Sequence, residues 1–252
     1  MRIWYLALVA AALAAPLHAQ NNPAETPDGA VPALEVSGGA AVVSQYRFRG
    51  IGLSDEKPAL QGWAEAEHES GVYAGFWGSS LDGFGELGGS NFELDLYAGY
   101  RTQVAESLTL DAGLLYYAYP GSTGGDFEFF EPYARAGFDI GPASVTLGAA
   151  FAPAQDGIGG NSNLYVSAAA STDIPGTPLS LDASIGRSEG DTTLTPGGGY
   201  TDWSLGASAS WQALTARIAY VGTDISDAEA LSAGATPDIV DDAVVFSLTA
   251  SF

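Results

Sequence analysis

The chain has 252 residues and carries 30 acidic side chains against 8 Lys or Arg, which gives a formal net charge of −22 at pH 7. A surface of this sign repels nucleic acid, so we expect no nucleic-acid partner. The lack of cysteine excludes disulfide bonds and thiolate metal ligands, and it is compatible with an exported protein that needs no covalent cross-link.

The first 19 residues have the pattern of a secretory signal peptide. Arg2 supplies a positive start, residues 5–15 are apolar, and the small Ala19 precedes the polar Gln20. This apolar run is shorter than the roughly 20 residues that a membrane-spanning helix needs. We therefore expect residues 1–19 to be a signal peptide that is removed on export.

After the signal, residues 20–36 are polar or small with several prolines, which predicts a flexible leader before one domain over residues 37–252. No later apolar stretch approaches the roughly 18 residues of a spanning helix, so any crossing of a membrane must use strands. Turn-forming residues divide the domain into about twelve strand-like segments. We place them near 38–49, 58–69, 71–80, 91–102, 107–119, 127–139, 143–152, 163–173, 178–187, 201–211, 213–223 and 242–252.

Pro132 lies inside the sixth of these segments. A proline cannot donate a ladder hydrogen bond, and a closed sheet leaves it no edge to occupy. We therefore expect a β-bulge at this position, or a strand that begins later than residue 127.

The connections between the segments alternate in length. The long ones are 50–57, 81–90, 120–126, 153–162, 188–200 and 224–241. The short ones are residue 70, 103–106, 140–142, 174–177 and residue 212. Short periplasmic turns and longer extracellular loops on an even number of strands are typical of outer-membrane barrels. The sequence therefore predicts an all-β fold: a single closed antiparallel transmembrane β-barrel of about twelve strands in the cell outer membrane.

Side-chain parity supports this interpretation. When the apolar residues of each segment are assigned to lipid, most charged residues fall on the opposite, inner face. Because an Arg that faces mid-bilayer lipid costs about 2 to 4 kcal/mol, membrane burial would impose this sorting. The predicted pore-lining residues are Arg47, Arg49, Glu65, Glu67, Glu93, Asp95, Arg101, Asp111, Arg135, Asp182, Asp202 and Arg217. Arg187 breaks the parity, but it lies at the predicted outer end of its strand.

Three aromatic pairs on the predicted lipid face are each eight residues apart. At about 3.3 Å per residue and a strand tilt of about 40°, this spacing spans roughly 20 Å along the membrane normal. That is close to the height of the apolar band of a barrel, about 25 Å. The predicted membrane girdle consists of Phe92 and Tyr100, Phe130 and Phe138, and Trp203 and Trp211.

The last segment alternates apolar and small polar residues and ends on Phe252. An apolar terminal strand promotes aggregation in a soluble protein, but in a closed barrel it can pair with the first strand. We expect Phe252 to be a signal for the outer-membrane assembly machinery. The other expected partners are outer-membrane lipid and lipopolysaccharide, with the solutes unknown.

Several stretches resemble the TorF family of proteobacterial outer-membrane porins. They are SQYRFRGIGLS (44–54), PALQG (58–62), SGVYAGFWGSS (70–80), ELDLYAGY (93–100) and YAYPG (117–121). The likeness is densest over residues 37–135, and the family commonly has Asp where Gln45 stands. The resemblance implies an outer-membrane barrel with pore activity.

The predicted first strand places Arg47 and Arg49 on the inner face, and the second places Glu65 and Glu67 there. Ion pairs between neighbouring strands are therefore expected. They would act either as a charged constriction that selects permeants or as a lattice that stiffens the wall. Because acids outnumber bases on this face, a pore would mildly prefer cations.

The last long connection is acidic, and Ser226 with Glu229 forms a capping-box pattern that predicts a short helix. The acids either hold calcium or magnesium bridges at the lipopolysaccharide surface or form a solvated charge run. Their spacing fits no known calcium loop, so we predict no metal site. The acids are Asp224, Asp227, Glu229, Asp238, Asp241 and Asp242.

Taken with the fold, these patterns predict a channel for passive diffusion of small hydrophilic solutes, without enzymatic activity or cofactor. A closed structural or adhesive barrel with acidic surface loops is the alternative. A hydrolase is the less favoured one, since it would have to use His68 with its sequence neighbours Glu69 and Ser70.

Overall fold

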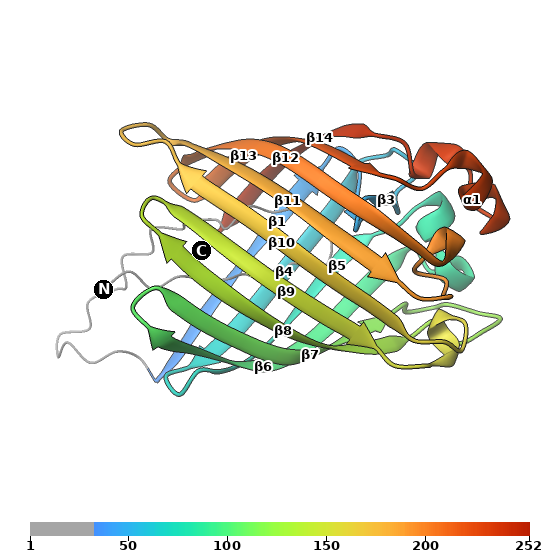
Figure 1. The fold of residues 1–252 in the computed structure, drawn as a ribbon, viewed down its shortest axis with the longest axis horizontal. Coiled ribbons are helices and arrows are strands. Elements are labelled where there is room, and N and C mark those ends of the chain that lie inside the picture. The colour runs from blue at the N-terminus through green and yellow to red at the C-terminus, as the bar shows by residue number, and fades with distance from the viewer. Residues whose placement is uncertain (1–32) are drawn as a thin grey trace.

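The computed structural model describes residues 33–252, so the predicted signal peptide and most of the predicted leader lie outside the described residues. Over residues 33–252, twelve long strands form one closed antiparallel barrel in which β1 pairs with both β4 and β14 (Figure 1). The predicted fold class is confirmed. The strands are β1 (Leu34–Val43), β4 (Ala59–His68), β5 (Val72–Ser80), β6 (Phe92–Ala105), β7 (Leu108–Ala118), β8 (Phe129–Ile140), β9 (Ala143–Ala152), β10 (Asn163–Asp173), β11 (Leu179–Glu189), β12 (Gly199–Trp211), β13 (Leu214–Thr223) and β14 (Ala243–Ser251).

The remaining elements are short and lie in the connections. They are the hairpin strands β2 (Arg47–Phe48) and β3 (Ile51–Gly52), helix α1 (Asp227–Ser232), and the 3₁₀ turns η1 (Gly83–Gly85), η2 (Leu87–Gly89), η3 (Asp156–Ile158), η4 (Pro196–Gly198) and η5 (Pro237–Ile239). Within the described chain, no helix is long and apolar enough to cross a membrane.

The two ends of the barrel differ as the connection lengths predict. The tight turns and the C-terminus lie at one end, and the long loops with α1 lie at the other (Figure 1). Because outer-membrane barrels have their short turns in the periplasm, we call these the periplasmic and the extracellular end.

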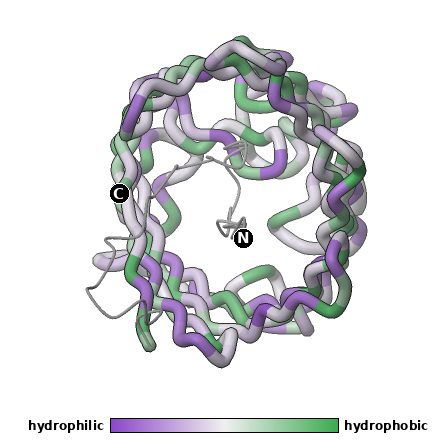
Figure 2. The backbone as a smooth tube through the Cα atoms, turned by 90° about the vertical axis from the view of Figure 1, so that its left-hand side faces the viewer, coloured by the Kyte–Doolittle hydropathy of each residue, from purple (hydrophilic) through white to green (hydrophobic). Residues whose placement is uncertain are grey.

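Side chains alternate between the two faces of the wall. The outward apolar residues are well exposed, for example Leu60 at 68% and Leu205 at 64%. Figure 2 looks at the barrel from its periplasmic end and shows hydrophilic and hydrophobic residues alternating around a closed ring. An apolar surface that continues around the whole wall is stable only in contact with lipid.

The first strand differs from the prediction. β1 spans Leu34–Val43 rather than 38–49, so it begins inside the predicted leader and ends before Arg47. Three consecutive residues, Tyr46, Arg47 and Phe48, are buried. A strand of the barrel wall would instead expose every second residue on its outer face. Arg49 and Gly50 then adopt the left-handed conformation, with φ of 47° and 85°, and turn the chain back.

The expectation of a bulge at Pro132 is wrong. β8 keeps an unbroken register with β7 through Pro132, which pairs with Leu114. The strand does begin later than predicted, at Phe129. Its ladder with β9 starts only at Tyr133 and Ala150, so Pro132 lies beyond the end of that ladder and its missing N–H breaks no bond there.

Phe252 closes the barrel. Its N–H donates to the Gly38 carbonyl at 2.9 Å, and the Gly38 N–H donates back to the Phe252 carbonyl at 3.1 Å. The Phe252 ring lies against Gly38, where an added Cβ would stand 3.0 Å from the ring. The residue therefore fixes the last strand to the first, while its role as an assembly signal stays a prediction.

Candidate functional site: a lumen crossed by a loop

Residues 44–58 form a loop that crosses the lumen, which we call the crossing loop. Around the ring of strands, β9 stands opposite β1. The crossing loop leaves β1, and Arg49 near its tip reaches side chains of β8 and β10, which flank β9. The loop therefore spans the full width of the barrel near its extracellular end.

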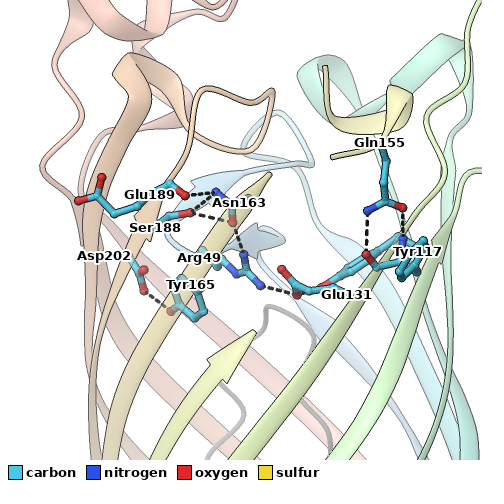
Figure 3. A network of polar contacts seen from close by, with 10 residues as sticks. Arg49, Tyr117, Glu131, Gln155, Asn163, Tyr165, Ser188, Glu189 and Asp202 are labelled. Atoms are coloured by element: carbon cyan, nitrogen blue, oxygen red, sulfur yellow. Dashed lines mark hydrogen bonds and ion pairs between the residues drawn. The ribbon is translucent and has the colours of Figure 1, made fainter. Parts of the chain in front are cut away.

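Arg49 is the anchor of this loop (Figure 3). Its Nη2 lies 2.6 Å from Glu131 Oε2, its Nη1 donates to Asn163 Oδ1 at 3.5 Å, and its guanidinium stacks on the Tyr165 ring at 4.0 Å. Burial alone would lower the pKa of Arg49, but the Glu131 carboxylate together with Tyr117 and Tyr165 outweighs burial and raises that pKa, so the guanidinium stays charged. Since both partners are buried, removing either would leave an uncompensated charge.

Apolar contacts hold the other side of the crossing loop. Tyr46 packs on Trp77 of β5 with ring centroids 5.3 Å apart, and Phe48 meets the edge of Tyr117 of β7 at 6.0 Å. Tyr117 in turn stacks on Phe129 at 4.2 Å. These rings form part of one buried cluster that fills the lumen beside β5 to β8 at this level.

Arg47 ties the crossing loop to the last loop. Its Nη1 donates to the backbone carbonyls of Asp241 at 2.6 Å, Gly50 at 2.9 Å and Ile239 at 3.5 Å. Because carbonyl groups carry no full negative charge, burial dominates and lowers the pKa of Arg47. Ile51 of the crossing loop packs in a second apolar cluster with Ile239 and other residues of the last loop.

Helix α1 of that last loop begins as the sequence predicts. The Ser226 hydroxyl accepts from the Glu229 N–H, and the Glu229 side chain accepts from the Ser226 N–H at 2.8 Å, which completes the capping box. The Ser226 hydroxyl also donates to Glu229 Oε2 at 2.6 Å, and this bond together with the one from the Ser226 N–H lowers the pKa of Glu229. Within residues 33–252, no group of three or more His, Asp or Glu side chains is placed to hold a metal ion.

Two buried acids lie on β6 behind the crossing loop. Glu93 is 1% exposed and Asp95 is fully buried, and among the described residues neither Asp95 oxygen has a hydrogen-bond partner. Burial together with the Glu93 charge raises the pKa of the nearby hydroxyls of Tyr46 and Tyr119. These groups lie deep in the packed side of the lumen, away from its exposed surface.

A second charge network lies closer to the periplasmic end. Arg101 Nη1 is 2.5 Å from Glu67 Oε2 and 3.3 Å from Glu65 Oε1, and its Nε is 3.9 Å from Asp111. Its guanidinium stacks on the Tyr73 ring at 4.5 Å. Arg101 therefore gathers acids from β4 and β7 around one cation.

The two sides of the inner surface have different side chains. The inner face of β4 to β8, which we call the bulky wall, is lined by large buried residues: Glu65, Tyr73, Trp77, Glu93, Asp95, Tyr97, Arg101, Asp111, Leu115, Tyr117, Phe129, Glu131 and Tyr133. The inner face of β9 to β14, which we call the hydroxyl wall, is lined mainly by small hydroxyl residues: Ser144, Thr146, Ser167, Ser171, Ser180, Ser184, Ser204, Ser208, Ser210, Thr215, Ser247, Thr249 and Ser251.

The hydroxyl wall is open to the lumen. Several of its inward side chains, such as Ser167 and Ser184, are partly exposed, and inward-facing Ala169 is exposed outright. Its one luminal arginine, Arg217, is neutralised by Asp182 at 2.5 Å and 3.1 Å. The exposed lumen surface therefore belongs mostly to this wall.

Comparison with known proteins agrees with this architecture. The model of a family described as bacterial proteins of unknown function (Gcw_chp) matches residues 27–252. The chain belongs to the Gcw_chp family. No curated protein matches it at a significant level.

Solved structures show the fold of this Gcw_chp chain. The KdgM porin in complex with disordered oligogalacturonate superposes with a TM-score of 0.55 at 6% identity, covering 86% of this chain and 98% of that one. The NanC porin gives 0.51 at 9% identity over 86% and 97% of the two chains. The COG4313 outer membrane channel from Pseudomonas putida F1 gives 0.52 at 12% identity over 88% and 96%. The Gcw_chp chain thus has the closed barrel fold of small outer-membrane channels.

The predicted pairing of Arg47 and Arg49 with Glu65 and Glu67 is wrong. The arginines lie on the crossing loop rather than on the first strand, and Glu65 and Glu67 are bound by Arg101. The error came from extending the first strand through residues 44–49, where the parity of the side chains no longer reports the faces of a sheet.

The other predicted lumen residues face inward as expected. They are Glu65, Glu67, Glu93, Asp95, Arg101, Asp111, Arg135, Asp182, Asp202 and Arg217. Phe92, Tyr100, Phe130, Phe138, Trp203 and Trp211 alternate with them and face outward, so their role in a membrane girdle stays a prediction. Glu131, Asn163 and Tyr165 were missed because they matter only through contact with a loop remote in sequence.

His68 lies at the periplasmic end of β4, in an exposed turn. Its Nδ1 is 2.9 Å from the Ser70 hydroxyl and accepts from the Ser70 N–H at 3.1 Å. This is the local side chain to backbone contact of a tight turn, and among the described residues no carboxylate binds the ring. The arrangement lacks the oriented acid of a hydrolase triad.

Proposed function

We propose that this protein is an outer-membrane channel through which small hydrophilic solutes diffuse passively, with a mild preference for cations. The observation that carries the proposal is the hydroxyl wall, on which small polar side chains such as Ser167, Ser171 and Ser184 face the lumen and remain partly exposed. A barrel of twelve strands has an interior between that of filled eight-stranded barrels and that of open sixteen-stranded ones. Small side chains over half the circumference leave room where bulky ones would not. The resemblance to TorF porins also supports this function.

Charge supports the cation preference. Acids outnumber arginines among inward-facing strand residues, and Asp139 and Asp173 add to them near the periplasmic end. Rings of acidic side chains favour cations in membrane pores. Because most luminal arginines are already paired with acids, the surplus is negative along the path.

The crossing loop supplies the constriction in this proposal. It occupies the extracellular part of the lumen beside the bulky wall and is fixed there by Arg49, Tyr46 and Phe48. Solutes would have to pass this loop, which also contacts the hydroxyl wall at Tyr165 of β10 and Thr223 of β13. The same packing favours the second candidate, a closed barrel with a structural or adhesive role, if the loop leaves no passage.

Planar-bilayer recordings with the purified mature protein distinguish these two candidates. Folding is checked first by heat-modifiable migration in gels, which reports a closed barrel. Discrete conductance steps from folded protein are the expected result. Silence from folded, heat-modifiable protein would instead support the closed barrel and overturn the channel.

A further inference from the structure

Arg135 is a partly exposed luminal arginine with no acid bound to it, whereas Arg47, which also binds no acid, is 6% exposed and held by backbone carbonyls. Arg49, Arg101 and Arg217 each lie 2.5 or 2.6 Å from a carboxylate oxygen. Among the described residues, no carboxylate lies within ion-pair distance of Arg135. Its guanidinium instead lies over the Tyr133 ring, 4.8 Å from the centroid, and the residue is partly exposed.

Asp111 stands opposite Arg135 across the ladder of β7 and β8 but is engaged elsewhere. Its carboxylate accepts from the Tyr73 hydroxyl and lies 3.9 Å from Arg101. On the same face of β8 as Arg135, Asp139 accepts from the Ser144 hydroxyl at 3.1 Å. Arg135 therefore keeps a positive charge that no neighbouring acid directly neutralises.

The position of Arg135 places this charge beside the exposed lumen. It lies four residues below Glu131 on the same face of β8, roughly 10 Å toward the periplasm at a strand tilt of about 40°, and so below the crossing loop. Its partner on β9 is Gly148, which has no side chain to cover it. Arg135 thus stands at the edge where the bulky wall meets the hydroxyl wall.

We propose that Arg135 is the residue that limits the cation preference of the lumen. This inference rests on the proposed channel function. The field of a paired arginine is cancelled at short range by its carboxylate, whereas the field of Arg135 reaches the passing ion. Arg135 therefore slows cations against the acidic background and gives small carboxylate or phosphate anions a contact point inside the lumen.

The test is the reversal potential of single channels under a salt gradient, measured with Arg135→Gln and with Arg187→Gln as a matched control. Both variants lose one positive charge, but Arg187 lies on the outer face at the extracellular rim, bound to Glu189 at 2.6 Å. For Arg135→Gln we expect cation permeability to rise and anion permeability to fall, each by about fivefold, as one unit charge about 4 Å from an ion in water would produce. Arg187→Gln should change both permeabilities little.

Arg135→Lys separates charge from packing on Tyr133, because it keeps the charge and loses the planar guanidinium. Selectivity close to that of the parent protein is expected. If the parent protein conducts and Arg135→Gln has the same selectivity as the parent, the role of Arg135 is overturned while the channel function stands. A folded parent barrel that never conducts would overturn the channel function and this inference together.

Discussion

The bulky wall and the hydroxyl wall share one outer surface but have opposite interiors. Both present apolar side chains to lipid, as Leu96 of β6 and Leu205 of β12 show. Inside, β4 to β8 bury aromatic rings and charge networks that also hold the crossing loop, while β9 to β14 carry mostly small hydroxyl residues. The lipid therefore constrains only one face of each strand. The other face is free to divide the lumen into a supporting side and a side that remains open.

Glycines on the bulky wall make room for its tyrosines. A Cβ at Gly99 would lie 2.4 Å from the Tyr73 hydroxyl, and one at Gly75 would lie 2.5 Å from that of Tyr97. Each tyrosine thus lies across the backbone of the neighbouring strand. Its hydroxyl can then join the polar network, as Tyr73 does with Tyr133 at 2.5 Å.

The two walls should differ most in how much their arginines contribute to the free energy of unfolding. Arg101→Leu leaves Glu65, Glu67 and Asp111 without their cation, and breaking a buried pair in this way costs about 3 to 5 kcal/mol. We expect a loss of this size in the free energy of unfolding, measured by urea titration of the barrel in lipid vesicles. Arg217→Leu, which leaves only Asp182 on the hydroxyl wall, should cost less. Equal losses for the two variants would show that the bulky wall contributes no more to stability than the hydroxyl wall does.

Adding one methyl group to each wall should reduce the free energy of unfolding by less than the loss of an arginine does. Gly99→Ala forces Tyr73 from its place and should cost about 1 to 3 kcal/mol, the usual range for overpacking. Gly148→Ala on the hydroxyl wall meets the Ser167 hydroxyl at 3.0 Å, which can rotate away, and Arg135 Cγ at an ordinary contact distance of 3.7 Å. The same urea titration measures both. A cost for Gly148→Ala as large as that for Gly99→Ala would contradict the difference in packing.

The crossing loop can be replaced without shortening the ladder between β1 and β4, but its removal leaves Glu131 without Arg49 and Phe246 without Ser44. Val43 and Ala59 are paired at the end of the ladder between β1 and β4, so a short Gly-Ser turn can replace residues 44–58. Because this loop forms the proposed constriction, we expect a several-fold larger single-channel conductance from the shortened protein. Unchanged conductance would place the narrowest point elsewhere.

Much of the fold could be predicted because lipid imposes a simple rule on every strand. An apolar outer face and alternating loop lengths were enough to place twelve strands, including β9 and β10 at their observed bounds. The rule fails where the chain leaves the lipid boundary. Residues 44–49 lie inside the lumen, so their alternation reports no outer face, and Arg47 and Arg49 were assigned to the wrong element.

The candidate site was predictable only in part for the same reason. Inward parity identified Arg101, Arg135 and Arg217, but parity gives the face and not the partner. The contact of Arg49 with Glu131 joins residues 82 positions apart and depends on how the crossing loop folds. No local pattern in the sequence specifies that contact.

The central claim is that water and solutes follow the hydroxyl wall, and the lack of native cysteine allows a direct test. Ser167→Cys places a thiol on the partly exposed hydroxyl wall, and Leu115→Cys places one on the bulky wall, where the native side chain is 4% exposed. With a charged, membrane-impermeant methanethiosulfonate reagent, we predict a stepwise fall in single-channel current for Ser167→Cys and none for Leu115→Cys. Modification that blocks Leu115→Cys while leaving Ser167→Cys unreactive would contradict the account.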